Sequence, residues 1–305
     1  MKAFVVVATK GRAKETFVLL DYLQQQSLLP SYVVVIGSEE SDIAGLNEHP
    51  LILSQQGELV VTTAGSCHQR NVGLDVIQQR TLELDASQWF VTFFDDDFRP
   101  ATDWLAKAGE FLRADSSVMG VTGHVLADGV GTEFGISELE AQLYLNGSRA
   151  CEPHWSHVDK PQELNGLYGC NMVIRGTSAS HVRFDENLPL YGWQEDYDFA
   201  NRSKEAGHLY VIPGCKGVHL GTSSGRTSGV KFGYSQIANP IYLAKKGTMP
   251  WHFARRMMFK NIAANIYKSL TLNKIKDYPG RLRGNLKAFG HLILNKLSPT
   301  NVLNI

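Results

Sequence analysis

The stretch Trp89-Phe90-Val91-Thr92-Phe93-Phe94-Asp95-Asp96-Asp97 decides the fold class of this 305-residue chain. Its first six residues are aromatic or β-branched and predict a buried strand. Three carboxylates follow directly, and they cannot be buried without a compensating charge. A divalent metal ion held through oxygen ligands supplies such a charge, and it usually keeps a phosphate among its ligands. The stretch therefore predicts a sheet with a metal and phosphate site at the end of one strand.

Apolar runs before this stretch predict further buried strands at residues 2–9, 32–36 and 59–62. Helical spacing predicts helices between them, at residues 15–26 and 67–82. Strands that alternate with helices form a mostly parallel sheet with helices on both faces, which is an α/β fold. Ligands of such sheets bind at the carboxyl ends of the strands, so we expect the polar residues there to converge.

The second half of the chain is less regular. Residues 126–165 show no clear period, and we expect an insert of this kind beside a site to shape specificity. Residues 222–233 are rich in Ser, Thr and Gly and predict a loop. Shorter patterns predict helices at residues 103–113 and 195–206, and strands at residues 118–125, 171–175 and 209–213.

The composition is typical of a soluble globular protein, with 43% apolar and 20% charged residues. The apolar run near the start is too short for a signal peptide, and no window predicts a transmembrane helix. The four cysteines have no zinc-site spacing, which predicts reduced thiols in a cytosolic protein.

A net charge of zero conceals two oppositely charged segments. Residues 241–305 contain 12 Lys or Arg and one acidic residue, a charge of +11, so residues 1–240 carry −11. We therefore expect a catalytic domain over residues 1–235 and a basic helical extension over residues 236–305. A basic segment of this kind favours an anionic partner, either a membrane surface or a nucleic acid.

Residues 251–270 within this extension alternate apolar and basic side chains at helical spacing. Such an amphipathic, aromatic-bearing stretch suits an anionic membrane surface. The alternatives are packing on the acidic part of the chain or a contact in a homo-oligomer. A nucleic-acid role is a weaker alternative, because the chain has no recognisable nucleic-acid module.

A second acidic site, Glu195-Asp196, opens the predicted helix at residues 195–206. A carboxylate beside an acceptor hydroxyl can remove its proton as the hydroxyl attacks. The alternative is that these acids only stabilise the N-terminus of the helix. The adjacent Trp193 is either a sugar-stacking platform or a core residue.

His219 and Arg70 are further candidate site residues. His219 follows a predicted strand, and together with the upstream carboxylates it is a candidate metal ligand; a lone histidine can also be structural. Arg70 lies just inside a predicted helix, where it could face a phosphate or a base, or simply lie on the surface.

The order of these motifs resembles family 2 glycosyltransferases with the GT-A fold, a Rossmann-like α/β fold. The resemblance covers residues 2–225. It is carried by Val5-Val6-Val7-Ala8-Thr9-Lys10-Gly11-Arg12, Arg70-Asn71-Val72-Gly73, Phe93-Phe94-Asp95-Asp96-Asp97-Phe98-Arg99-Pro100, Gly169-Cys170-Asn171-Met172-Val173-Ile174-Arg175 and Tyr191-Gly192-Trp193-Gln194-Glu195-Asp196-Tyr197-Asp198, followed by His219.

The resemblance implies inverting transfer of a sugar from a nucleotide donor, with Mg²⁺ or Mn²⁺. It implies a DxD pair of Asp95 and Asp97, with Asp97 closest to the metal and His219 completing the metal site. Asp196, with Glu195 beside it, would be the catalytic base. The donor-binding residues would be Thr9, Arg12, Glu39, Arg70, Asp95, Asp96 and Trp193.

One segment departs from the family pattern. Many members carry an acidic residue at the end of the second strand, which contacts the base of the nucleotide. Here that strand is followed by Gly37-Ser38-Glu39-Glu40, so either Glu39 substitutes or backbone groups hold the base.

We therefore expect a transferase that uses a UDP- or dTDP-linked sugar and an acceptor hydroxyl on a lipid-linked or cell-surface polysaccharide. Its expected location is the cytoplasm, at the inner face of the plasma membrane as a peripheral protein. The alternatives are a metal-dependent nucleotidyltransferase and a non-catalytic glycan- or nucleotide-binding protein. The nucleotidyltransferase is disfavoured because the turn at residues 10–12 is not a glycine-rich phosphate loop.

Overall fold

A computed structural model of the chain describes residues 1–222, 228–273 and 275–305. Where it is described, the chain forms two compact units. The first comprises Met1–Ala64, His68–Arg183 and Phe199–Gly225, and the second comprises Gly65–Cys67, Phe184–Asp198 and Arg226–Ile305. The predicted boundary between residues 235 and 236 lies inside helix α8.

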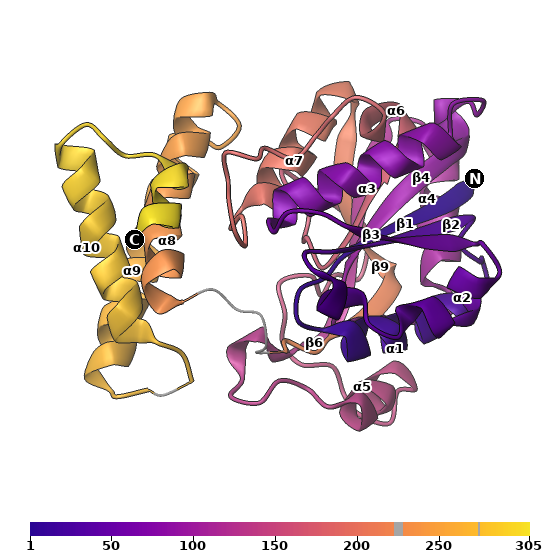
Figure 1. The fold of residues 1–305 in the computed structure, drawn as a ribbon, viewed down its shortest axis with the longest axis horizontal. Helices are drawn as coiled ribbons and strands as arrows, with labels where there is room; N and C mark the ends of the chain where they lie inside the picture. Colours follow the sequence, from indigo (N-terminus) through magenta and orange to yellow (C-terminus); the bar gives the residue numbers. More distant parts are fainter. Residues whose placement is uncertain (223–227, 274) are drawn as a thin grey trace. The chain divides into compact units, whose positions relative to one another are not determined.

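A nine-stranded sheet forms the centre of the first unit over its described residues (Figure 1). The strand order is β3-β2-β1-β4-β8-β6-β9-β5, and β7 pairs with β9 outside this path. The strands are β1 (Lys2–Ala8), β2 (Tyr32–Gly37), β3 (Gly57–Val61), β4 (Trp89–Asp95), β5 (Phe98–Pro100), β6 (Val118–Asp128), β7 (Gln162–Leu164), β8 (Asn171–Arg175) and β9 (His208–His219).

The helices follow the same chain order. They are α1 (Ala13–Gln24), α2 (Pro50–Leu53), α3 (Ser66–Arg80), α4 (Trp104–Ala114), α5 (Glu138–Leu145), α6 (Gly176–Ala179), α7 (Glu195–Ser203), α8 (Gly229–Lys246), α9 (Trp251–Leu270) and α10 (Tyr278–Ile293).

The predicted α/β fold class is confirmed. Strands β3, β2, β1 and β4 all pair in parallel with their neighbours. Beyond β4 the sheet is mixed, because β8 runs antiparallel to both β4 and β6. The chain crosses the sheet one way from β1 to β3 and returns to place β4 on the other side of β1. This reversal puts the connecting helices on opposite faces, since such crossovers are right-handed.

The two faces of the sheet bury alternate residues of each strand. Val5 and Val7 share one core with Leu20 of α1 and with residues of α4. Val6 faces α3, because a Cβ built on Gly73 of that helix would lie 2.5 Å from Val6 Cγ1. Figure 1 shows α1 and α3 on opposite sides of the strands.

The insert at residues 126–165 contains elements that its sequence does not predict. Helix α5 begins after Ser137, whose hydroxyl accepts from the Glu140 amide in a reciprocal capping box. The helix has only eight residues, of which Ala141 and Tyr144 are buried. So short a helix shows too few buried positions to produce a clear period.

The predicted loop at residues 222–233 is wrong in its last part. Helix α8 begins at Gly229, and the Ser228 hydroxyl accepts from the Lys231 amide at its N-terminus. Residues 223–227 of this prediction lie outside the described residues. The structure describes all four cysteines, and no disulfide joins any two of them.

The second unit has a small core of its own. Tyr234, Ile237 and Ile241 of α8 pack with Ala288 of α10 and Val302. A buried amide network supplements this core, because Asn265 of α9 donates to the side-chain oxygens of Gln236 and Asn285. Across the described ranges, none of the helices has the length and hydropathy to span a bilayer.

We expect Gly73→Ala to destabilise the protein, because the added methyl group would lie 2.5 Å from Val6 Cγ1 and 2.9 Å from Ile36 Cδ1. Overpacking costs about 1–3 kcal/mol, and the gain in helix propensity returns at most about 1 kcal/mol. Gly290→Ala in α10 is the control, because nothing lies within 4 Å of its added Cβ. Urea unfolding should show a lower midpoint for Gly73→Ala and an unchanged or higher one for Gly290→Ala. Equal midpoints for both variants would contradict the close packing of α3 on the sheet.

We also expect His124 of β6 to make the fold sensitive to acid. Within the described part of the chain both of its ring nitrogens are buried without a hydrogen-bond partner, and its ring centroid lies 4.2 Å from that of His157. Burial, and then the charges of His157 and Lys216, lower the pKa of His124 to about 4. In the unfolded chain a histidine has a pKa of about 6.5. Between about pH 4 and pH 6.5 the unfolded state therefore binds more protons than the folded state.

The free energy of unfolding should therefore fall as the pH drops from about 6.5 to about 4. His124→Leu should reduce this fall, while His252→Gln, at an exposed position on α9, should leave it unchanged. Thermal unfolding at several pH values in this range measures the change in stability with pH. The same acid dependence in wild type and His124→Leu would show that another group causes it.

Candidate metal centre and its surroundings

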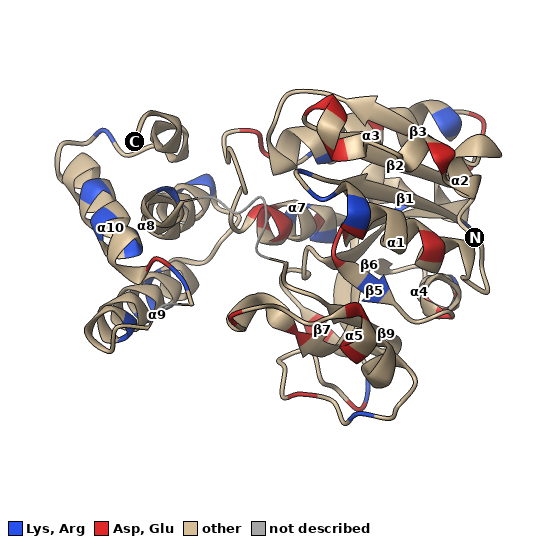
Figure 2. Ribbon diagram, turned by 60° about the horizontal axis from the view of Figure 1, so that its bottom comes forward, with Lys and Arg blue, Asp and Glu red and all other residues tan. Residues whose placement is uncertain are grey.

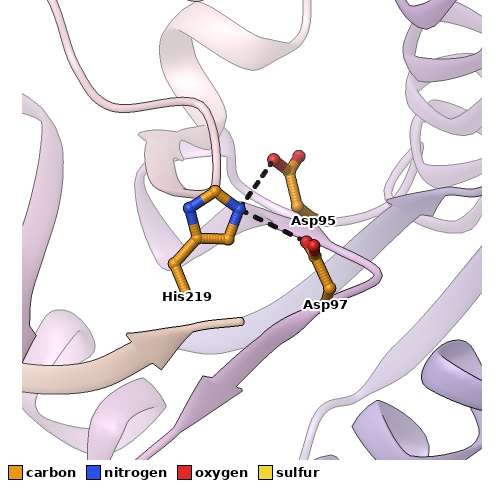
Figure 3. Close-up of side chains that lie close together, drawn as sticks. All are labelled: Asp95, Asp97 and His219. Carbon is orange, nitrogen blue, oxygen red and sulfur yellow. Dashed lines mark ion pairs between the residues drawn. The ribbon is translucent and has the colours of Figure 1, made fainter. Parts of the chain in front are cut away.

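Three predicted site residues come together at the carboxyl end of β4. Asp95 is the last residue of β4, Asp97 lies in the turn before β5, and His219 ends β9. Phe98 of β5 pairs with His219, which brings the histidine beside that turn. One ligand atom from each of the three side chains lies within 4.8 Å of the others (Figure 3).

The donor atoms suit a divalent cation. His219 Nε2 lies 3.3 Å from Asp97 Oδ1 and 3.9 Å from Asp95 Oδ2. Asp97 Oδ1 is buried, and among the described residues it has no partner apart from the His219 imidazole. A buried carboxylate oxygen without a donor is costly unless a cation faces it. Two carboxylates and one imidazole are suitable ligands for Mn²⁺ or Mg²⁺, so these residues fit a metal ion.

The other nitrogen of His219 faces a carboxylate that sequence reasoning missed. His219 Nδ1 lies 3.2 Å from Asp128 Oδ1, and Asp128 Oδ2 accepts a hydrogen bond of 2.7 Å from the Tyr168 hydroxyl. A carboxylate in this position orients an imidazole so that its opposite nitrogen can bind a metal. The available signal was the position of Asp128, just beyond a predicted strand.

The charges of this cluster depend on one another. Burial alone would raise the pKa of Asp97, but the neighbouring His219 and Arg12 hold that pKa well below its usual range. Burial would lower the pKa of His219, but Asp97 and Asp128 raise it well above its usual value. His219 therefore carries a proton when no metal is bound. A metal that takes Nε2 as a ligand must displace that proton.

Asp96 faces away from this cluster, towards the turn after β1. It is buried, Thr9 Oγ1 donates to its Oδ2 at 2.8 Å, and Arg12 Nη1 donates to its Oδ1 at 2.8 Å. Burial, with the charge of Asp97 also acting against ionisation, raises the pKa of Asp96 to about 7, and Arg12 opposes this rise. Both carboxylate oxygens are thus engaged by donors of the protein.

The two predicted arginines contact the acidic triplet directly. Arg70, which is buried in α3, donates to Asp95 Oδ1 at 2.9 Å. Arg12 Nη1 lies 3.4 Å from Asp97 Oδ2, and Arg12 Nη2 donates to the carbonyl of Thr222 at 2.8 Å. The two guanidinium groups offset the repulsion between three adjacent carboxylates.

The end of β2 holds a second residue that sequence reasoning missed. Asp42 is fully buried and accepts hydrogen bonds from the amides of Gly11, Ser38 and Glu39 and from the Ser38 hydroxyl. Burial opposes its charge, but these donors lower the pKa of Asp42. The predicted Glu39 is exposed, and its Oε1 accepts from the Ser41 hydroxyl at 2.7 Å. Asp42 therefore connects the turns that follow β1 and β2.

Glu195, Asp196 and Trp193 belong to the second unit. Glu195 and Asp196 open helix α7, where their charges favour its N-terminus. Glu195 is buried and its Oε1 accepts from the Ser66 hydroxyl at 3.5 Å, whereas Asp196 is partly exposed. The Trp193 ring packs edge-on against Phe232, with centroids 6.0 Å apart.

The fold is shared with glycosyltransferases of known structure. No protein-family profile and no curated protein matches the sequence. The structure of TarS from S. aureus aligns with a TM-score of 0.52 and 16% identity over 80% of this chain and 40% of TarS. Residues 1–349 of TarS in complex with UDP align with a TM-score of 0.50 and 18% identity over 80% of this chain and 66% of that one.

A second enzyme aligns over nearly the whole chain. The mannosyltransferase PcManGT from Pyrobaculum calidifontis, in complex with GDP-Man and Mn²⁺, has a TM-score of 0.52 and 17% identity over 97% of this chain and 87% of that one. This chain corresponds to less than half of TarS and to most of PcManGT. At these identities the likeness establishes a common fold, that of the GT-A glycosyltransferases.

Proposed function

We propose that this protein is an inverting, family 2-like glycosyltransferase that moves a sugar from a nucleoside-diphosphate sugar to an acceptor hydroxyl. The observation that carries this proposal is the cluster of Asp95, Asp97 and His219 at the carboxyl end of β4, in which the buried Asp97 Oδ1 has no partner among the described residues apart from His219. The shared fold supports the substrate class, since one structure with this fold holds UDP and another holds GDP-Man and Mn²⁺.

Asp95, Asp97 and His219 would hold Mg²⁺ or Mn²⁺. When bound, such an ion neutralises the charge that develops on a leaving diphosphate. Asp128 would keep His219 Nε2 directed at the ion through its contact with Nδ1. Arg12 pairs with Asp96 and Arg70 pairs with Asp95, and these guanidinium groups would reduce the repulsion between the acidic triplet and the diphosphate.

The remaining donor contacts are assigned on the family resemblance. Thr9 and Arg12 would line the nucleotide pocket, Glu39 would face the base, and Trp193 would support a sugar ring. Asp95 and Asp96 would complete the acidic edge, with Asp96 acting through Arg12. We expect a UDP- or dTDP-linked donor.

Asp196 would act as the catalytic base, with Glu195 beside it. The acceptor oxygen would attack the anomeric carbon as its proton passes to the Asp196 carboxylate. The bond from that carbon to the diphosphate oxygen would break, and the diphosphate would leave with the electron pair. Attack opposite the leaving group inverts the configuration. The expected acceptor is a hydroxyl of a lipid-linked or cell-surface polysaccharide.

Metal-dependent donor binding tests the first part of this proposal. We expect a nucleotide at about one hundred times its Kd to stabilise the protein by roughly 2.7 kcal/mol in the presence of Mn²⁺, and much less with EDTA. A thermal-shift screen of nucleoside diphosphates and their sugars measures this. Asp97→Asn should abolish the Mn²⁺-dependent part, while Glu83→Gln, an exposed carboxylate of the same unit, should retain it. Stabilisation that is equal with and without metal would reject the metal site.

Turnover of Asp196→Asn tests the base. We expect kcat to fall by about 10²–10⁴-fold, because the amide cannot take the acceptor proton. Donor affinity should be unchanged, and Glu205→Gln, at an exposed position, should retain activity. Full turnover by Asp196→Asn would reject it as the base. Release of free diphosphate with a nucleotide left on the product would instead identify a nucleotidyltransferase.

A further inference from the structure

Helix α9 exposes an apolar ridge that its own core does not use. Phe259, Ala263, Ile266 and Leu270 follow the i, i+4, i+7, i+11 spacing, so they lie on one face of the helix. Phe259 is 74% exposed and Leu270 is 78% exposed.

Helix α10 exposes a second ridge. Leu286 and Ile293 are one heptad apart, and both are largely exposed, Ile293 to 84%. Leu294 follows directly and is also exposed. Ala288 of the same helix is fully buried in the core of the second unit, so the exposed and buried faces of α10 are distinct.

The core of the unit is formed by a neighbouring face of α9. Met258 and Ile262 of α9 pack against the buried cluster around Tyr234 and Ile237 of α8. Phe259 and Ile266 lie one turn from Ile262, beside this core-facing stripe, and remain exposed. Exposed apolar ridges of this length usually mark a surface that binds something.

Basic side chains flank both ridges. Arg255, Arg256 and Lys260 are exposed on α9, and Arg283 and Lys287 are exposed on α10. In Figure 2 the helices α8, α9 and α10 carry Lys and Arg with almost no Asp or Glu. Residues 241–305 contain one acidic residue, Asp277. Its Oδ1 accepts a hydrogen bond from the Gly280 amide at the start of α10.

This charge pattern decides which occupant fits. A second copy that paired ridge to ridge would bring the basic flanks of both copies face to face, which is repulsive. A nucleic acid would satisfy the basic flanks but would leave Phe259 and Leu270 in water, since its outer surface is charged phosphate. An anionic bilayer offers both an apolar layer and negative head groups above it.

We propose that α9 and α10 dock this protein on an anionic lipid surface, with the two ridges inserted below the head groups and the basic residues among the lipid phosphates. The helices would lie along the surface rather than cross it, because neither exposes apolar residues on every side. The docking does not depend on the transferase chemistry of the first unit.

Sedimentation of the full-length protein with lipid vesicles tests this proposal. Vesicles of phosphatidylcholine alone are compared with vesicles in which about a third of the lipid is phosphatidylglycerol. We expect at least about tenfold tighter binding to the anionic vesicles, reduced by about 0.5 M salt because surface charges are then screened. Arg255→Gln combined with Lys260→Gln should remove most of this preference.

A matched pair of variants separates the ridges from general hydrophobicity. Phe259→Ser combined with Ile293→Ser should weaken vesicle binding by at least about tenfold. Leu53→Ser combined with Leu82→Ser removes two similarly exposed apolar residues of the first unit and should leave binding unchanged. Circular dichroism verifies that each variant folds.

Three outcomes would overturn the proposal. The first is equal binding to neutral and anionic vesicles, and the second is an equal loss in the two double variants. The third is a concentration-dependent dimer that Phe259→Ser and Ile293→Ser abolish, with no vesicle binding by the wild type. Retention of metal-dependent nucleotide binding by the ridge variant would show that failure to dock is separate from failure of the proposed transferase site.

Discussion

The buried ion pair between Arg12 and Asp96 is the interaction on which the polar edge of the first unit depends. Burial favours the neutral form of Asp96, and the charge of Arg12 favours its carboxylate. Thr9 completes the pairing, and Arg12 also donates to the carbonyl of Thr222, whose amide donates to Asp97. One guanidinium therefore connects the turn after β1, the turn after β4 and the segment after β9.

This arrangement gives three consecutive carboxylates three different environments. Asp96 is enclosed by protein donors, Asp95 is partly exposed beside Arg70, and Asp97 has one buried oxygen that faces His219. The last residue of β6 is Asp128, which sets the orientation of the imidazole opposite Asp97. A metal site at this edge thus depends on groups that are not themselves ligands, because they determine which donor atoms remain free to face the ion.

In the second unit, different faces of the same helices form the core and the proposed lipid-docking surface. One face of α9 and α10 closes the core around Tyr234, and another face exposes Phe259 and Ile293 between basic side chains. Residues 241–305 contain 12 Lys or Arg and one acidic residue, so most of these basic side chains cannot pair with a carboxylate of the same segment. An anionic surface would supply the negative charges that this segment lacks, which relates the charge asymmetry of the chain to its proposed location.

The sequence by itself determined the α/β class and most strands and helices, and it placed Asp95 and Asp97 at a strand end, because these are local patterns. The expectation that His219 completes their metal site came from the family resemblance. The sequence did not reveal helix α5, whose eight residues form only about two turns and are too few to show a period. The contact of Asp128 with His219 was decided only by tertiary structure. It arises from the pairing of β6 with β9, and a register between strands distant in the chain depends on the packing of the whole sheet.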